Sequence, residues 1–403
     1  MRVGPLARLR TGVSYVLGRF GRRDPGTWVF GNQKGFRDNP RYLAEHVAHH
    51  HPDVEVWWIA RREGEAAAAR DAGLRAALRG TQEAAGVQRR AAAAFLSNGF
   101  QDLQPEHLGG AFVVDLRHGK GLKRVLLDMD DKRPTSWWRT PLAALQAWWI
   151  RRRLGRISLI VAPGEMARQM YLSAYGTDPS RVQILGSPRF DVIEGGDAFE
   201  RASGGDLRAR LGVHGDDYVV LWLPTWREAG DAAWLPRLDA QTLDGCLDGT
   251  RIVLLAKPHP FSDEAVYRER LPEGPRLRLL PEADVDANCL LRVADALVTD
   301  FSSAAFDFAL LDRPLHFFVP DIDDYRGGKG LYEPLDTISG GSHHTDWPSL
   351  LAAVRDAAAG TDATGLANAR RTLARGGLNA EPGSSERIYR VVASSIGLGP
   401  ADD

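Results

Sequence analysis

The sequence contains little cysteine and no excess of charge of either sign. Only two of its 403 residues are cysteines, Cys246 and Cys289, and they lie far apart with no metal-ligand spacing around them. This pattern favours a reducing, cytosolic setting over a disulfide framework, and it carries no zinc-site signature. The net charge of -1 gives no bulk attraction to nucleic acid, so we expect no nucleic-acid partner.

Long apolar runs are also missing. No segment approaches the roughly 20 apolar residues that a membrane-spanning helix needs, and the N-terminus has no compact apolar signal core. We therefore expect a cytoplasmic chain. Two segments, residues 1–26 and 137–156, combine arginines with aliphatic or tryptophan side chains, as helices on a membrane surface do. Helices that cover a protein core fit the same pattern, so both interpretations stay open.

Lysine is scarce as well. Of 51 basic residues only six are lysines, namely Lys34, Lys120, Lys123, Lys132, Lys257 and Lys329. Arginine is therefore the default cation of this chain. Where lysine persists against that background, a compact and rotatable ammonium is favoured over a planar guanidinium. Five of the six lysines lie in the motifs described below.

What the sequence does contain is an alternation of strand-like apolar runs with helical stretches, which is typical of parallel α/β sheets. A first series lies at 27–31, 54–60, 93–99, 111–119, 157–164 and 182–191, with helices expected between 61 and 90. A polar, glycine-bearing segment at 194–206 reads as a linker. A second series follows at 218–226, 251–260, 277–281, 296–300 and 314–321. The pattern predicts two doubly wound, Rossmann-like domains at 27–192 and 205–378, with a basic amphipathic segment at 1–26 and a C-terminal helix and tail at 379–403.

Polar side chains follow several of the predicted strands, which is where open α/β sheets bind ligands. Taken singly, each group fits a helix cap, a rigid turn or a surface cation. Together they supply hydroxyls and N–H groups for phosphate oxygens, cations for developing charge, and histidines for proton transfer. The sequence thus indicates transfer of a phosphoryl-type group. The groups are Arg117-His118-Gly119-Lys120-Gly121-Leu122-Lys123, Pro224-Thr225-Trp226-Arg227, Lys257-Pro258-His259-Pro260 and Asp300-Phe301-Ser302-Ser303.

Asp300 does not fit a simple phosphate site, because its carboxylate adds negative charge. We expect it to orient the turn, or to contact a sugar or base hydroxyl; as a third alternative, Asp300 or Ser302 caps a helix that starts near Ala304. A polar loop between Gly31 and Gly35 gives a further, weaker phosphate-loop signal, because no dinucleotide-binding or Walker pattern is present.

Two histidine clusters invite a metal hypothesis, the run His49-His50-His51 and the pair His343-His344. Adjacent residues on a regular element cannot all face one ion. We therefore predict no metal site, and no cofactor besides the substrates.

The ordered set of motifs resembles the CDP-glycerol glycerophosphotransferase family, whose members build poly(glycerol phosphate) or poly(ribitol phosphate) chains of teichoic acids and some capsules. The resemblance covers residues from about 28 to 335. Besides the groups above it includes Gly31, Gly35, Asn39-Pro40, Gly186-Ser187-Pro188-Arg189-Phe190-Asp191, Asp307-Phe308 and Asp321, Tyr325, Gly330-Leu331-Tyr332.

The resemblance implies a GT-B fold, with two Rossmann-like domains facing across a cleft, an acceptor domain first and a CDP-donor domain second. It implies attack by an acceptor hydroxyl on the β-phosphate of CDP-glycerol or CDP-ribitol, with release of CMP. His118 would be the general base, and His259 with Ser302 and Ser303 would hold the donor pyrophosphate. Further substrate-binding residues would be Lys123, Thr225, Arg227, Lys257, Asp300 and Arg189, with the loop 326–332 shaping the donor pocket.

The family also implies a lipid-linked or anionic glycan acceptor and a peripheral position on the inner face of the cell membrane. One departure is informative: Arg117 stands where the family has an aromatic residue, and Lys120-Gly121 stands for Thr-Pro. Two extra cations beside the proposed base would bind an anionic acceptor or keep the histidine neutral. Two rival functions stay open, a GT-B glycosyltransferase that uses a nucleotide sugar and a catalytically silent nucleotide-binding scaffold of the same pathway.

Overall fold

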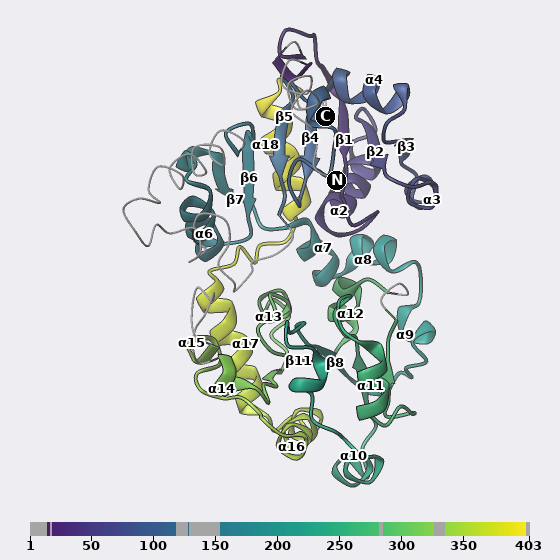
Figure 1. Ribbon diagram of the computed structural model, residues 1–403, viewed down its shortest axis with the longest axis vertical. Helices are drawn as coiled ribbons and strands as arrows, with labels where there is room; N and C mark the ends of the chain where they lie inside the picture. Colours follow the sequence, from purple (N-terminus) through teal and green to yellow (C-terminus); the bar gives the residue numbers. More distant parts are fainter. Residues whose placement is uncertain are drawn as a thin grey trace. The chain divides into compact units, whose positions relative to one another are not determined.

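The computed structural model describes residues 14–16, 18–117, 128, 154–281, 285–325 and 335–399 of the chain. These residues divide into two compact units (Figure 1). Unit 1 contains the described residues up to Asp191 together with those from Asn379 onward, and unit 2 contains those from Val192 to Leu378. The C-terminal segment therefore belongs to the same unit as the N-terminal half. That one unit takes the acceptor and the other the donor stays a prediction.

Unit 1 is built on a parallel sheet with strand order β3-β2-β1-β4-β5-β6-β7. The strands are almost wholly apolar, and in β4 all six residues are buried, as expected for strands covered on both faces. The strands are β1 (Asp24–Phe30), β2 (Glu55–Ala60), β3 (Arg75–Leu78), β4 (Ala91–Leu96), β5 (Phe112–Asp115), β6 (Leu159–Ala162) and β7 (Val182–Ile184). The helices are α2 (Asp38–His50), α3 (Glu63–Asp71), α4 (Gln82–Arg90), η1 (Pro105–His107), α6 (Glu165–Tyr175), η5 (Pro179–Arg181) and α18 (Ser384–Ser395), and α7 (Pro188–Glu194) spans the boundary of the units.

The C-terminal helix α18 is part of the core of unit 1. It packs on α2, and its Ile388 and Tyr389 join Trp28, Trp58 and Phe95 in one buried cluster. Asp191 fixes the start of α18, because its carboxylate accepts the backbone N–H groups of Ser384 and Ser385 at 2.8 Å each. The last helix is thus tied to unit 1 by apolar burial and by a capped N-terminus.

Unit 2 is built on a second parallel sheet, with strand order β10-β9-β8-β11-β12. The strands are β8 (Tyr218–Leu223), β9 (Ile252–Ala256), β10 (Leu277–Leu279), β11 (Ala296–Thr299) and β12 (Leu315–Phe317). The helices are α8 (Gly196–Ser203), α9 (Leu207–Arg210), η6 (Asp231–Ala233), α10 (Ala240–Leu247), α11 (Glu264–Arg270), α12 (Ala287–Val293), α13 (Ala304–Ala309), α14 (Ile322–Tyr325), α15 (Leu335–Ser339), α16 (Trp347–Ala358) and α17 (Ala363–Gly376). The aromatic side chains of its core are Trp222, Trp234, Tyr267, Phe318 and Trp347.

Both sheets have the doubly wound order in which the first strand lies in the interior and the fourth strand pairs with it on the side away from the second. The prediction of two Rossmann-like units is confirmed. The order reverses between β1 and β4 in unit 1 and between β8 and β11 in unit 2. Ligands of such sheets bind beyond the carboxyl ends of these strands, so both reversal points are candidate ligand-binding positions.

Two expectations of local structure are wrong. The stretch from 61 to 90 contains a strand, β3, between its two helices. Its sequence, Arg-Ala-Ala-Leu, has no β-branched residue, and it forms a strand because it pairs with β2 at the sheet edge. The predicted linker at 194–206 contains α8, which packs against α12.

In the part of the chain that the structure describes, no helix is long and apolar enough to cross a bilayer. Most of the predicted basic segment at 1–26 and nearly all of the tryptophan-rich segment at 137–156 lie outside the described residues.

Candidate active site

Several loops of unit 2 follow the carboxyl ends of neighbouring strands and therefore lie at one edge of its sheet. Thr225 and Arg227 follow β8, Lys257 and His259 follow β9, and residues 300–303 follow β11. Because β8 and β11 flank the point where the strand order reverses, this edge is the expected ligand-binding edge of the unit.

Asp300 joins the ends of the two central strands. Its carboxylate accepts the backbone N–H of Thr225 at 2.9 and 3.1 Å and the Thr225 hydroxyl at 2.5 Å, and it pairs with Nη1 of Arg227 at 2.8 Å. The residue is 1% exposed. The prediction that this carboxylate orients the turn fits these contacts, and the carboxylate has no part in capping the helix that follows.

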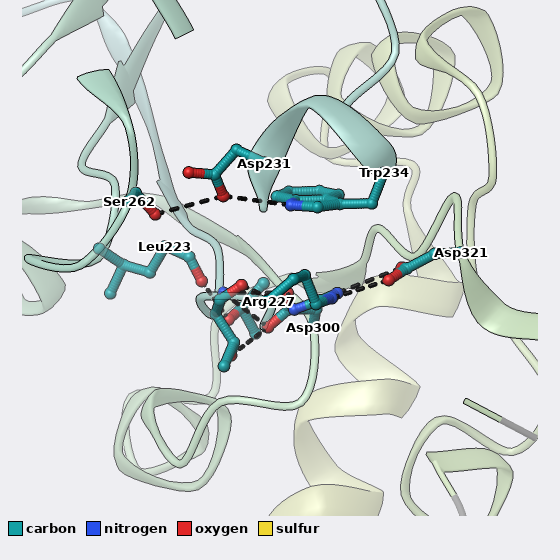
Figure 2. Close-up of polar contacts among 9 residues, drawn as sticks. Leu223, Arg227, Asp231, Trp234, Ser262, Asp300 and Asp321 are labelled. Atoms are coloured by element: carbon teal, nitrogen blue, oxygen red, sulfur yellow. Dashed lines mark hydrogen bonds and ion pairs between the residues drawn. The ribbon is translucent and has the colours of Figure 1, made fainter. Parts of the chain in front are cut away.

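Arg227 lies between two carboxylates, as Figure 2 shows. Its Nε and Nη2 donate to Asp321 at 2.7 and 3.2 Å, on the side opposite Asp300. The guanidinium also lies over the rings of Trp234 and Phe301, at 4.8 and 5.1 Å from the ring centroids. With 3% of the residue exposed, this cation is held by charge and by aromatic faces at once.

The loop after β9 carries a buried lysine and an exposed histidine. Lys257 is 9% exposed, and its ammonium donates to the carbonyl of Pro281 at 2.9 Å. His259 is exposed, and its Nδ1 accepts the backbone N–H of Phe261 at 3.2 Å. That hydrogen bond assigns the proton of the neutral ring to Nε2. His259 can therefore present an N–H donor to a ligand.

Ser302 and Ser303 lead into α13. The hydroxyl oxygen of Ser302 accepts the backbone N–H of Ala304 at 3.2 Å, whereas Ser303 occupies the N-cap position without a side-chain cap bond. Both serines are partly exposed. The predicted helix start near Ala304 is confirmed, and its local side-chain cap comes from Ser302.

Sequence reasoning missed Asp231. Its Oδ1 accepts hydrogen bonds from Nε1 of Trp234 at 3.2 Å and from the hydroxyl of Ser262 at 3.4 Å (Figure 2). Its Oδ2 accepts the backbone N–H of Asp263 at 2.7 Å. This aspartate fastens the loop that carries His259 to the turn that carries Trp234. Asp321 belongs to a recognised motif, but the sequence did not predict its ion pair with Arg227.

In unit 1, the fully buried Asn39 connects several segments of the chain by hydrogen bonds. Its Nδ2 donates to the carbonyls of Leu116 and Arg117 at 3.3 and 2.7 Å. Its Oδ1 accepts the hydroxyl of Ser187 at 2.9 Å and the backbone N–H of Arg189 at 3.1 Å. One amide thus joins the start of α2, the chain after β5 and the loop after β7. Arg189, a predicted binding residue, is 4% exposed.

The residue next to the proposed base, Arg117, is partly buried and lies against two aromatic rings. Its guanidinium lies 5.4 and 5.2 Å from the ring centroids of Tyr171 and Tyr175 and 3.6 Å from Asp115. Burial raises the pKa of Asp115 to about 6, although Arg117 opposes this shift. Arg117 also has a φ of +53°, a left-handed conformation that costs a non-glycine residue roughly 1–2 kcal/mol. A strained backbone conformation at Arg117 thus immediately precedes His118 in the chain.

The predicted site residues fall into four groups. Thr225, Arg227 and Asp300 are in direct contact with one another. Lys257, His259, Ser302 and Ser303 lie on loops at the same sheet edge, and Arg189 belongs to unit 1. His118, Lys123 and the loop 326–332 lie outside the described residues.

Known proteins place the chain in a family. A family model described as CDP-Glycerol:Poly(glycerophosphate) glycerophosphotransferase matches residues 15–394. A teichoic acid poly(glycerol phosphate) polymerase of Staphylococcus epidermidis is 26% identical over 76% of this chain and 42% of its own length. A teichoic acid ribitol-phosphate polymerase of Staphylococcus aureus is 26% identical over 46% of this chain and 33% of its own length. The chain thus spans less than half the length of these curated relatives.

A solved structure, that of the wall teichoic acid polymerase TagF, matches with a TM-score of 0.74 and 21% identity, over 96% of this chain and 93% of that chain. At this identity the likeness shows the fold alone, and it agrees with the predicted GT-B class. The family model, by contrast, extends over nearly the whole chain. The chain therefore belongs to the CDP-glycerol:poly(glycerophosphate) glycerophosphotransferase family.

Proposed function

We propose that this protein transfers an alditol phosphate, glycerol phosphate or ribitol phosphate, from a CDP-alditol to a hydroxyl of a teichoic-acid-type, lipid-linked glycan acceptor, with release of CMP. The observation that carries the proposal is the family match over residues 15–394. The names of the relatives, polymerases of poly(glycerol phosphate) and of ribitol phosphate, support both alditols.

We assign the donor to the sheet edge of unit 2. His259 would donate Nε2–H to a pyrophosphate oxygen, and Ser302 and Ser303 would donate their hydroxyls there. Thr225, Arg227 and Asp300 have their polar atoms engaged with one another, and Arg227 also with Asp321. We therefore give these three a supporting role: they hold the strand ends from which the ligand-binding loops extend. Lys257 would add positive charge below the same loops.

We assign the acceptor and the general base to unit 1. His118 would take the proton of the acceptor hydroxyl while the hydroxyl oxygen attacks the β-phosphorus of the donor. The bond from that phosphorus to the bridging oxygen breaks, and CMP leaves with the electron pair. Asn39 and Arg189 would fix the backbone around the base, and Lys123 would attract an anionic acceptor.

The experiment that tests the function offers purified protein a panel of CDP-glycerol, CDP-ribitol and nucleotide sugars with a lipid-linked acceptor. We expect release of CMP from one CDP-alditol and a phosphodiester-linked alditol in the product. A glycosidic product would identify the glycosyltransferase rival instead. A scaffold is indicated if His118→Ala leaves the polymer of the cell unchanged while deletion of the protein abolishes it.

We further propose that the protein works at the cytoplasmic membrane surface. In the described part of the N-terminal segment, Val16 and Phe20 are 53% and 86% exposed beside Arg19. Tyr15, Arg19, Arg156 and Arg181 line a cavity of about 550 Å³, and the Arg156 guanidinium lies 4.2 Å from the ring centroid of Tyr15. Exposed apolar groups among arginines are suited to an anionic headgroup layer. Vesicles with anionic lipid should sediment the wild type and release Phe20→Ser, whereas equal binding by both would remove the support from this segment.

A further inference from the structure

Unit 1 contains a cluster of two histidines and a glutamate that the proposed transfer reaction does not use. His46 and His51 come from α2 and its end, and Glu386 comes from α18, at the other end of the sequence. Nε2 of His51 lies 2.8 Å and Nε2 of His46 lies 3.2 Å from the same carboxylate oxygen, Oε2 of Glu386. All three side chains are partly buried, at 17%, 18% and 28% exposure for His46, His51 and Glu386.

The end of α2 explains how two histidines five positions apart reach one point. On a continued helix, residues i and i+5 point about 140° apart, so they cannot share a ligand. His51 is instead the C-cap of α2, with φ of -131° and ψ of 69°, while its N–H still bonds to the carbonyl of Val47 at 2.9 Å. The non-helical backbone turns the His51 ring back toward His46.

The surroundings hold the ligands in place. The ring of His51 stacks on Tyr389, with centroids 3.4 Å apart and an angle of 12° between the planes. Nε of Arg390 donates to Oε1 of Glu386 at 2.8 Å, which leaves Oε2 directed at the histidines. Partners of this kind orient the ligands of protein metal sites.

The distances from Oε2 of Glu386 to the two histidine nitrogens are close to the ligand–ligand distances of a tetrahedral zinc site. With Zn–N and Zn–O bonds of about 2.0–2.1 Å, neighbouring ligand atoms lie roughly 3.3 Å apart. The three ligand atoms of the cluster lie within 4.8 Å of one another, with the two nitrogen–oxygen distances at 3.2 and 2.8 Å. A shift of about half an ångström would open the centre for an ion, and a water molecule would complete the four ligands.

We propose that His46, His51 and Glu386 form a binding site for a divalent transition-metal ion of the Zn²⁺ class, which fastens the C-terminal helix α18 to α2. Two neutral imidazoles and one carboxylate are ligands that such ions accept, and Mg²⁺ or Ca²⁺ would prefer oxygen ligands. The proposal differs from the prediction of no metal site, and it does not use the His49-His50-His51 run as a unit: only His51 of the run takes part, with partners outside the run. The proposal does not depend on the transferase activity.

The test uses the full chain, treated with a chelator and then titrated with Zn²⁺ by calorimetry and with Co²⁺ by visible absorption. We expect one ion per chain, and Co²⁺ bands of a four-coordinate site. Loss of an outer-shell partner weakens metal binding by about 10- to 100-fold. Removal of a direct ligand, in Glu386→Gln, His46→Gln or His51→Gln, should weaken Zn²⁺ binding at least as much. The matched control is His49→Gln, an exposed histidine of the same helix, which should bind as the wild type does.

Hydrogen exchange gives a second readout that does not need activity. Zn²⁺ should slow exchange in α18 of the wild type and of His49→Gln, but not of Glu386→Gln. Circular dichroism identifies any variant that fails to fold, and the two histidine variants then replace it in the comparison. Equal Zn²⁺ affinity of the wild type and Glu386→Gln would overturn the proposal. So would a loss in His49→Gln as large as in His51→Gln, because the ion would then sit on the exposed histidine run.

Discussion

The two units use an aspartate at the same place in the same topology, but the partners of the two aspartates differ. In unit 1, Asp102 follows β4 and accepts three backbone N–H groups, those of Gln33 at 2.8 Å, Ser97 at 2.7 Å and Asn98 at 2.6 Å. In unit 2, Asp300 follows β11 and accepts a backbone N–H, a hydroxyl and the guanidinium of Arg227. Both carboxylates are 1% exposed and both bridge the strands between which the order reverses.

The two units compensate the buried acid at this sheet edge in different ways. In unit 1 the acid is compensated by neutral dipoles, burial raises its pKa, and the backbone approaches closely: a Cβ on Gly31 would lie 2.6 Å from the carbonyl oxygen of Asp102. In unit 2 the acid is compensated by a buried cation, which a second acid, Asp321, holds from its other side. Unit 1 is thus closed by hydrogen bonds to backbone, and unit 2 by an ionic network.

The largest expected effect comes from removing one charge of that network. Asp300→Asn leaves Arg227 buried with one carboxylate fewer, and breaking a buried ion pair costs about 3–5 kcal/mol. The matched change Asp102→Asn disturbs only bonds to neutral N–H groups, at about 1–3 kcal/mol. Urea unfolding combined with hydrogen exchange of each unit measures both. Equal losses would contradict the distinction between ionic and neutral junctions.

A double-mutant cycle tests the same ionic network. The double variant with Arg227→Met and Asp300→Asn should lose far less stability than the two single variants lose together. The reason is that it no longer contains the buried cation that Asp300→Asn alone leaves without one of its carboxylates. Additive losses would mean that the pair contributes nothing specific.

The second expected effect concerns the neutral junction of unit 1. Asn39→Asp keeps the acceptor for Ser187 and Arg189 but places a carboxylate oxygen against the carbonyls of Leu116 and Arg117. We expect a loss of about 1–3 kcal/mol in stability of unit 1. If the chain before His118 is positioned by this amide, kcat should fall more than the KM for the donor changes. The control is Asn379→Ala, a partly buried asparagine of the same unit whose amide oxygen only accepts the N–H of Glu381.

The strands, their parallel sheets and the doubly wound order were predictable, because apolar runs such as β8 and β9 are buried on both faces and have no other stable place. The short strand β3 was not, because its residues carry no strand preference and only the neighbouring strand makes it one. The motif residues of the site were predictable one by one. Their partners were not: which strand end Asp300 or Asp321 meets follows from the order of strands in the sheet, which periodicity does not encode. The contact of Asn39 with the chain after β5 depends on the same order.

The third expected effect is on pH dependence, and it has opposite signs for Asp115 in unit 1 and His344 in unit 2. Burial raises the pKa of Asp115 in unit 1 to about 6, so between pH 4 and 6 the unfolded chain loses a proton that the fold keeps. The contribution of Asp115 to the stability of unit 1 should therefore fall as the pH rises through this window, whereas His46 and His107 of the same unit, whose pKa values burial lowers, contribute in the opposite direction. Asp115→Asn should remove the Asp115 contribution to the slope, whatever it does to the absolute stability.

In unit 2, burial and then the neighbouring His316 lower the pKa of His344 to about 4. Between pH 6.5 and 4 the unfolded chain gains a proton that the fold refuses, so stability of unit 2 should fall as the pH falls. His344→Gln should flatten this slope. Hydrogen exchange of each unit, corrected for the intrinsic rate at each pH, measures both windows. The slope of the wild type minus that of Asp115→Asn should be negative with rising pH, and the slope of the wild type minus that of His344→Gln should be positive; differences of the same sign would contradict the prediction.

The smallest expected effect separates ligand binding from folding at the edge of unit 2. Ser302→Ala removes the partly exposed hydroxyl that accepts the backbone N–H of Ala304, and it should lower the free energy of unfolding by at most about 1 kcal/mol. Ser303→Ala removes no side-chain cap bond. If both hydroxyls face the donor pyrophosphate, each change should raise the KM for the CDP-alditol several-fold, with little change in unfolding. Ser349→Ala is the control, because Ser349 also stands at a helix start of unit 2 and its hydroxyl bonds to the carbonyl of Asp346. An unchanged KM in both Ser302→Ala and Ser303→Ala would mean that the ionic network of unit 2 supports a loop that the donor does not touch.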